Sequence, residues 1–262
     1  MNIVVCMKVV PKAEQVRLDP ETRTLDRSGA ENEINEPDKN ALEMALQLKE
    51  QYGGTVTVLS MGPPFFDEYL RLAVAMGADD AVLLSDRALA GADTLATSYA
   101  LAKGVQKVAD VDLVLCGEES SDGATGQVPP GIAEWLDWSQ ITYVAELSLL
   151  DDGRLRGRRT IHGGHEVVAV PLPAVASVEL GVNSPRFPDF RRKRWADREF
   201  ELTVWDAADI GADPALIGIE GSRSVVSDLI EKERPERMRH RIDGTVEEKA
   251  QQLFEIIEPY LQ

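Results

Sequence analysis

Apolar and polar residues alternate along the first half of the chain with two different periods. Short runs of consecutive apolar residues predict four buried strands, at 2–9, 55–61, 81–85 and 112–117. Longer segments with apolar residues three or four positions apart predict four helices, at 38–51, 64–76, 93–108 and 126–136. Because strands and helices alternate along the chain, we expect right-handed crossovers between parallel strands. The predicted fold class is α/β, with an open, mostly parallel Rossmann-like sheet.

The pattern changes after residue 140. Residues 141–180 alternate apolar and polar side chains around a turn at Asp151–Gly153, which predicts antiparallel strands added to the sheet. The last part of the chain carries little apolar material, apart from a one-sided apolar stripe on a predicted helix at 246–261. We therefore expect an α/β domain at 1–200 and an extended C-terminal arm at 201–262 that packs on another subunit.

Composition narrows the functions that the chain can serve. Of its 262 residues, 44% are hydrophobic, which is enough to form a core and excludes a wholly disordered chain. No apolar run reaches the ~18–20 residues of a membrane-spanning helix, and a net charge of −17 disfavours nucleic-acid binding. Cys6 and Cys116 lie in apolar stretches and are interpreted as small buried hydrophobes. A strand is predicted from the start, so we expect no cleaved leader and a reducing, cytoplasmic location.

The loops after the predicted strands hold the candidate binding residues, because ligands of open α/β sheets bind at the carboxyl ends of the strands. After the first strand, Asn35 and Asp38 stand before a helix, and capping of that helix is the competing role for Asp38. After the second strand, Gly62 permits close backbone approach. None of these residues by itself indicates a particular ligand.

The third and fourth loops carry more information. In the third, Asp93 or Thr94 can cap the next helix, and the helix N–H groups, hydroxyls and Arg87 would suit an anion. The alternative is a plain cap with the arginine on the surface. In the fourth, 117–130, small residues leave room for a phosphate-binding nest, although neither a Walker motif nor GxGxxG is present. We predict that a pyrophosphate lies between the start of the helix predicted at 93–108 and residues 125–128.

The sequence offers no catalytic constellation. It has no GxSxG or HExxH motif, and its three His and two Cys have no ligand spacing for zinc. His162 and His165 flank a Gly-Gly pair, which is typical of a hairpin tip. We therefore expect no catalytic side chains and no metal, and any redox chemistry would come from a bound cofactor.

Five segments, in order, carry a family resemblance: NIVVCMKVVP, INEPDKNALEMALQLK, VLSMGPP, GADDAVLLSDRALAGADTLATSYALA and DLVLCGEESSDGATGQVPPGIAEWL. Through them the chain resembles the small (beta) subunit of electron transfer flavoproteins over essentially its whole length. The resemblance implies a heterodimer with a larger alpha subunit, whose FAD exchanges electrons with a partner dehydrogenase of the acyl-CoA dehydrogenase type. It also implies a nucleotide in the beta subunit, which is a structural AMP in ordinary members.

In the electron-bifurcating branch of the family, the beta subunit holds a second FAD that NADH reduces. The segment SDRALAGADTLATS resembles that branch, so FAD with NADH as substrate is the first expectation and AMP is the alternative. Position and resemblance together predict these cofactor-binding residues: Val9, Asn35, Asp38, Met61, Gly62, Arg87, Asp93, Thr94, Thr97, Gly117, Asp122, Gly123, Thr125, Gly126, Gln127 and Val128. A nucleotide-sensing domain of similar fold without redox work is the hypothesis outside the family.

Two regions bear on how far the resemblance extends. Ala124, Gly126 and Pro129 depart from the family pattern inside the nucleotide loop, which leaves its detailed contacts open. The segment 177–195 aligns with the family's partner-recognition loop and ends in a basic run at 191–194. We interpret it as a docking site for acidic dehydrogenase surfaces, with a solvated charge run as the alternative.

Overall fold

The computed structural model describes residues 1–12, 17–18, 25–26, 31–225 and 241–260. The chain divides into two compact units, Met1–Asp228 and Leu229–Gln262. The first unit is the α/β domain, and it includes part of the segment predicted as a C-terminal arm. The described part of the second unit holds helix α7 (Val246–Ile257) and the short 3-10 turn η4 (Glu258–Tyr260).

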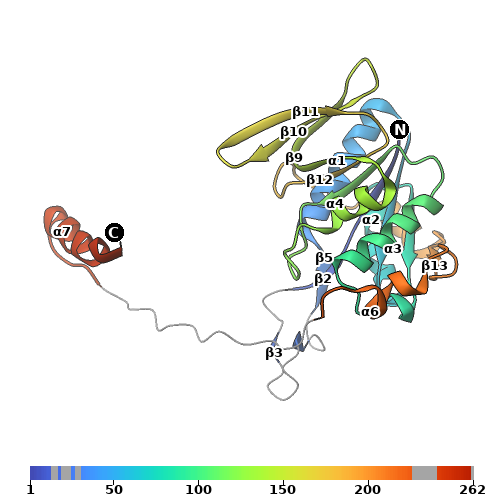
Figure 1. Cartoon of the computed structure of the whole chain (residues 1–262). Helices are drawn as coiled ribbons and strands as arrows, with labels where there is room; N and C mark the ends of the chain where they lie inside the picture. The colour runs from blue at the N-terminus through green and yellow to red at the C-terminus, as the bar shows by residue number, and fades with distance from the viewer. Residues whose placement is uncertain (13–16, 19–24, 27–30, 226–240, 261–262) are drawn as a thin grey trace. The chain divides into compact units, whose positions relative to one another are not determined.

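Nine strands form the main sheet of the first unit (Figure 1). Their order is β11 (Gly164–Val170), β10 (Leu155–Ile161), β9 (Ser139–Leu149), β12 (Ala174–Val178), β8 (Leu113–Gly117), β1 (Asn2–Cys6), β6 (Thr55–Met61), β7 (Asp80–Leu84) and β13 (Thr203–Trp205). Neighbours from β9 to β13 are parallel, whereas β10 pairs antiparallel with β9 and β11. The predicted open, mostly parallel sheet with added antiparallel strands is confirmed.

One strand runs in a direction that the alternating pattern did not predict. β12 lies in the region expected to be antiparallel, yet it is parallel to both of its neighbours, β8 and β9. The reason is topological, because the chain leaves the β9–β10–β11 meander and enters the sheet between β8 and β9. Antiparallel pairing within the sheet is thus limited to the meander.

Helices cover both faces of the sheet. The first face carries α1 (Glu36–Tyr52), α2 (Asp67–Met76) and α5 (Phe190–Arg198), and the second carries α3 (Thr94–Lys107), α4 (Val128–Leu136) and α6 (Gly218–Gly221). Successive residues of a strand point to opposite faces, so Ile3 and Val5 join one core cluster while Val4 and Cys6 join the other. The central strands are therefore buried on both sides, as the continuous apolar runs predict.

The connection between β1 and α1 differs from the prediction. The strand predicted at 2–9 ends at Cys6, and the chain then forms β2 (Val9–Pro11), which pairs with β5 (Asn32–Ile34). Between β2 and β5 in the sequence, β3 (Arg17–Leu18) pairs antiparallel with β4 (Leu25–Asp26). Among the described residues, no helix combines the length and the apolar character that crossing a bilayer requires.

Candidate functional site

The parallel strands β1, β6, β7 and β8 bring the loops with the predicted site residues to one edge of the sheet, because their carboxyl ends meet there. From β1 the chain proceeds to β6 and β7 on one side, and then to β8 on the other side of β1. The ends of β1 and β8 therefore mark the topological switch point, where open α/β sheets bind their ligands.

Asp38 joins the two strands at this switch point. Its carboxylate accepts hydrogen bonds from the backbone N–H of Lys8 (2.7 Å) and of Gly117 (3.0 Å). Burial raises the pKa of this carboxyl group to about 6, although both N–H groups and the nearby lysine lower it. A β-carbon at position 117 would lie 2.4 Å from Oδ1 of Asp38, so the carboxylate requires glycine there. The capping role weighed for Asp38 is wrong, because its oxygens bind neighbouring strand ends instead.

Asn35 and Lys8 hold the loop that follows β8. The side chain of Asn35 is only 2% exposed; it donates to the carbonyl of Glu119 (2.9 Å) and accepts from the N–H of Ser121 (3.1 Å). The ammonium of Lys8 binds a carboxylate oxygen of Asp122 at 2.6 Å. The sequence singled out Asn35 and Asp122 but not Lys8, whose position directly after a strand was the available signal.

The loop itself folds into a tight turn. The N–H groups of Gly123 and Ala124 donate to the carbonyl of Ser120, at 3.2 and 2.7 Å. Ala124 and Gly126 have positive φ values of 45° and 62°, which turn successive peptide groups in different directions. The loop from Ser121 to Thr125 is exposed, so its backbone is accessible to a ligand.

The starts of α3 and α4 meet at this loop. The hydroxyl of Thr94 donates to the side-chain oxygen of Gln127 at 2.8 Å, which links the two helix starts directly. The two helix starts between which the pyrophosphate was predicted therefore lie side by side. The placement of the ligand itself remains a prediction.

Asp93 caps α3 more completely than the sequence suggests. One carboxylate oxygen accepts from the N–H of Leu95 and of Ala96, at 3.0 and 3.1 Å. The other accepts from the backbone of Arg223 and Ser224, at 2.8 and 2.9 Å. Burial acts to raise the pKa of Asp93, but these hydrogen bonds outweigh it and lower the pKa to about 2. The amides of the first turn are thus already bound by the chain's own carboxylate.

The other predicted residues have local roles in the structure. α4 begins at Val128, and the prolines at 129 and 130 have no N–H to offer to an anion. A β-carbon on Gly62 would lie 2.2 Å from the ring of Phe66, so packing requires this glycine. Val9 pairs with Ile34 across β2 and β5. Met61 ends β6, Arg87 is exposed in the turn after β7, and Thr97 lies in the first turns of α3.

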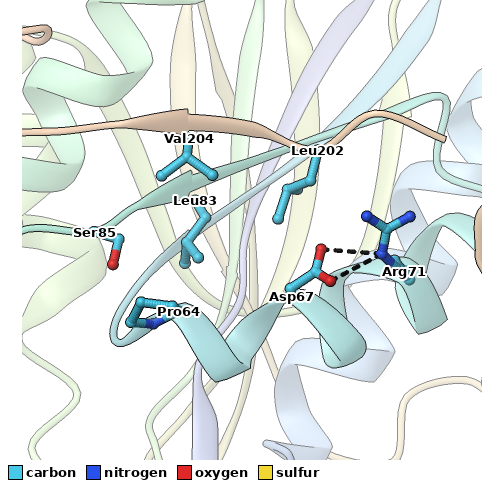
Figure 2. Close-up of a pocket in the computed structure, with 7 residues that line it drawn as sticks. All are labelled: Pro64, Asp67, Arg71, Leu83, Ser85, Leu202 and Val204. Carbon is cyan, nitrogen blue, oxygen red and sulfur yellow. Dashed lines mark hydrogen bonds and ion pairs between the residues drawn. The ribbon is translucent and has the colours of Figure 1, made fainter.

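A pocket of about 240 Å³ lies away from the switch point, between α2 and the β7–β13 edge (Figure 2). Leu83, Leu202 and Val204 supply its apolar lining, and the ion pair of Asp67 and Arg71 forms one end. The guanidinium of Arg71 also donates to the backbone carbonyls of Ala196 in α5 and of Phe200 just after it. Its volume is below the ~300–1,000 Å³ of typical small-molecule sites, so we assign it no ligand.

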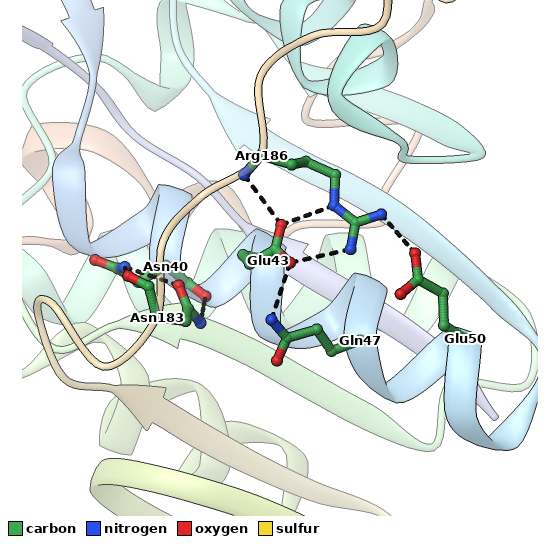
Figure 3. A network of polar contacts seen from close by, with 6 residues as sticks. All are labelled: Asn40, Glu43, Gln47, Glu50, Asn183 and Arg186. Atoms are coloured by element: carbon green, nitrogen blue, oxygen red, sulfur yellow. Dashed lines mark hydrogen bonds and ion pairs between the residues drawn. The ribbon is translucent and has the colours of Figure 1, made fainter.

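The predicted partner-recognition segment is fixed to α1 by a polar network (Figure 3). The guanidinium of Arg186 forms a two-pronged ion pair with the buried carboxylate of Glu43, at 2.8 and 3.0 Å, and also binds Glu50. Burial acts to raise the pKa of Glu43, but the hydrogen bonds from Arg186 and Gln47 lower it below its usual value. Asn40 adds reciprocal side-chain-to-backbone bonds with Asn183.

This anchored segment presents apolar side chains to solvent. Phe187 is 94% exposed, Phe190 84% and Leu180 55%. In the basic run, however, Arg192 donates to the carbonyls of Val74 (3.1 Å) and Ala78 (2.6 Å) at the end of α2. Part of the predicted docking charge is therefore structural, while the exposed apolar side chains lie beside it.

The hairpin tip predicted for the two histidines is confirmed. Ile161 pairs with Gly164 at the end of β10 and β11, so His162 lies in the turn between them. Among the described residues, no three His, Cys, Asp or Glu side chains gather into a possible metal site. Cys6 and Cys116 are both buried, as predicted, in register on β1 and β8.

Comparison with known proteins identifies the family of the chain. The model of the electron transfer flavoprotein domain matches residues 22–210. The chain belongs to the electron transfer flavoprotein family. The resemblance stated from the five segments is thereby confirmed, and the matched range covers strands from β6 to β13.

Several relatives are similar along most of their length. The electron transfer flavoprotein subunit beta of Thermoanaerobacterium thermosaccharolyticum is 42% identical over 97% of both chains. Protein FixA of Azotobacter vinelandii is 44% identical over 87% of this chain and 83% of its own. The caffeyl-CoA reductase-Etf complex subunit CarD of Acetobacterium woodii is 43% identical over 86% of each chain.

Proposed function

We propose that this chain is the beta subunit of a heterodimeric electron transfer flavoprotein, that it binds FAD at the switch point between β1 and β8, and that this flavin accepts hydride from NADH. The observation that carries the proposal is the assembly of loops at one sheet edge. Lys8, Asn35 and Thr94 each bind a residue of the loop after β8. These bonds hold the loop in a defined position, which favours a nucleotide-binding role. The sequence offers no acid–base constellation, which favours chemistry by a bound cofactor.

The residues present fit an adenine nucleotide. Gly123 and Gly126 leave the loop surface without side chains, and β-carbons there would lie 3.1 Å from the hydroxyl groups of Ser120 and Tyr143. The ammonium of Lys8 is half-exposed beside the loop, and a phosphate there would share it with the carboxylate of Asp122, its ion-pair partner. Exposed backbone and one cation are what a phosphate group requires.

When bound, a flavin supplies hydride and single-electron transfer by itself. The chain's own residues would provide position. Lys8 and residues 123–128 would hold the phosphates, and the bonds of Asn35 and Asp38 keep this loop against β1. A fixed loop favours hydride transfer because the reacting rings must meet at close range.

A second function is a one-flavin carrier in which this site holds a structural AMP. Two observations favour it. The first-turn amides of α3 are bound to Asp93, and Pro129 and Pro130 remove two donors from α4. The site therefore offers fewer donors to a diphosphate than two open helix starts would.

Two partners complete the proposal. An alpha subunit would bind the apolar residues of α7, which include the half-exposed Leu253 and Phe254. A dehydrogenase of the acyl-CoA dehydrogenase type would dock on the exposed Leu180, Phe187 and Phe190. Exposed apolar side chains on a fixed backbone lose little conformational entropy on docking, which favours this use.

Counting nucleotides tests the proposal. The complex of this chain with its alpha subunit is purified, and FAD and AMP are measured per heterodimer after extraction. Two FAD support the proposal, one FAD with one AMP supports the one-flavin carrier, and the absence of both flavin and AMP excludes each of them. Anaerobic titration with NADH is the second measurement. Bleaching of the flavin by about two hydride equivalents is expected, and reduction only through a dehydrogenase would contradict NADH oxidation at this site.

A further inference from the structure

Tyr143 has a backbone conformation that tyrosine rarely adopts. Its φ is +56°, in the left-handed region, although it lies within strand β9. In the pairing with β12, Ile141 is opposite Ala176 and Val144 is opposite Val178. Two residues of β9 therefore face a single residue of β12, which is a β-bulge. The left-handed position of a bulge is commonly glycine, because glycine has no β-carbon to clash.

The surroundings hold this bulge from both sides. The N–H of Tyr143 donates to the hydroxyl of Ser177 at 3.0 Å, and Ser177 is 2% exposed. On the opposite side, the guanidinium of Arg159 donates to the carbonyl and the hydroxyl of Thr142, at 3.0 and 2.9 Å. The strained residue is thus fixed by side chains on both neighbouring strands, and its conformation is part of the fold.

The bulge directs the phenol of Tyr143 to the candidate nucleotide site. A β-carbon on Gly126 would lie 3.1 Å from the phenol oxygen. The tyrosine is nevertheless 42% exposed, so much of its ring does not pack in the core. Within the described part of the chain, nothing hydrogen-bonds to the phenol oxygen. Packing and internal hydrogen bonds therefore leave the choice of tyrosine at a glycine-favouring position unexplained.

We propose that Tyr143 is a nucleotide-binding residue whose hydroxyl donates a hydrogen bond to the ligand held by the loop after β8. The inference rests on the proposed nucleotide function of that loop. Bulges beside functional sites turn side chains towards them, and backbone strain gathers where function requires it. The ligand is an adenine nucleotide, and the acceptor is a phosphate or ribose oxygen. AMP and the adenylate half of FAD share these groups.

Tyr143→Phe and Tyr143→Gly test the inference in the purified heterodimer. Nucleotide content is measured after extraction, and the stripped complex is titrated with AMP and, separately, with FAD to distinguish the two sources. Tyr143→Phe is expected to weaken binding about fivefold to tenfold, the effect of one hydrogen bond. Tyr143→Gly is expected to weaken it at least as much, while its urea-unfolding midpoint stays equal to or above that of the wild type, because the strain is relieved.

Tyr52→Phe is the matched control. The Tyr52 hydroxyl accepts a hydrogen bond from the N–H of Leu149 at 3.2 Å, at the far end of α1, so its loss should leave nucleotide affinity unchanged. Wild-type affinity in Tyr143→Phe would overturn the inference, as would a lower unfolding midpoint without weaker binding in Tyr143→Gly. A wild-type complex that neither contains nor binds AMP or FAD would instead overturn the proposed function.

Discussion

Asp38 and Gly117 depend on each other at the switch point. The carboxylate connects the ends of β1 and β8 through two backbone N–H groups, and glycine leaves the space that it occupies. The connection has a cost, because burial disfavours the charged form and raises the pKa to about 6. The folded protein therefore gains stability from Asp38 when the carboxyl group is protonated.

The pH dependence of stability reports this cost. The folded-state pKa of about 6 exceeds the ordinary aspartate pKa of 3.8, so stability from this group is full below about pH 4 and is lost as pH rises through 6. Between pH 8 and pH 5 the wild type should gain about 1.4 kcal/mol over Asp38→Asn, which has no proton to bind. Urea unfolding followed by tryptophan fluorescence measures the difference. Equal pH dependence of the two proteins would contradict the raised pKa.

Gly117→Ala tests the space beside the carboxylate. Its β-carbon would lie 2.4 Å from Oδ1 of Asp38 and 2.6 Å from Cβ of Pro37, so the loop must shift. We expect a loss of about 1–3 kcal/mol in unfolding free energy. Gly164→Ala is the control, because a β-carbon there meets no atom within 4 Å. A similar loss in both variants would show that close packing at position 117 is not the cause.

Among the elements, α1 connects the proposed nucleotide site with the proposed docking segment. Its first turn carries Asp38, which binds the end of β8 at Gly117, and its middle carries Asn40 and Glu43, which bind the 183–186 segment. The segment is thereby fixed to a helix that packs across β1 and β8. Exposed apolar side chains near this anchor are expected to keep a defined position before any partner binds.

Arg186→Ala measures the strength of this anchor. The variant leaves the carboxylate of Glu43, which is 5% exposed, without its cation. We expect a loss of about 2–3 kcal/mol in unfolding free energy and faster proteolysis near residue 186. Arg154→Ala is the control, since its ion pair with Asp152 is half-exposed and should contribute below about 0.5 kcal/mol. Equal, small losses in both variants would count against a rigid anchor.

At the scale of the whole molecule, the chain combines an α/β domain with a separate second unit. The described helix of that unit, α7, has no buried residue, and its apolar side chains include Leu253, Phe254 and Ile257. A short helix with a one-sided apolar stripe is expected to pack against another surface. The proposed occupant of this stripe is the alpha subunit.

Removal of the residues after Arg241 tests this role. The truncated chain should bind the alpha subunit at least tenfold more weakly, because the apolar area of α7 is then lost from the interface. Leu253→Ser should weaken binding in the same direction, whereas Gln251→Ser, a polar change on the same helix, should not. Co-purification of the truncated chain at full stoichiometry and unchanged affinity would disprove the idea.

The local elements and the fold class follow from the sequence alone. The strand predicted at 55–61 coincides with β6, and the helix predicted at 93–108 lies within one residue of α3 at each end. These predictions succeed because apolar periodicity and capping residues are local properties of the chain. The candidate loops could also be predicted, because a sheet of parallel strands places the carboxyl ends of those strands at one edge.

The groups that those loops contact follow from the three-dimensional arrangement of distant segments. Asp93 caps α3, as the sequence allows, but its second oxygen also accepts from the N–H of Ser224, which is 131 positions away and which no local pattern connects to it. β12 became parallel because it enters between β8 and β9. The left-handed conformation of Tyr143 arises from a bulge between strands distant in sequence. Contacts between distant segments depend on strand order and register, and neither is encoded in a local pattern.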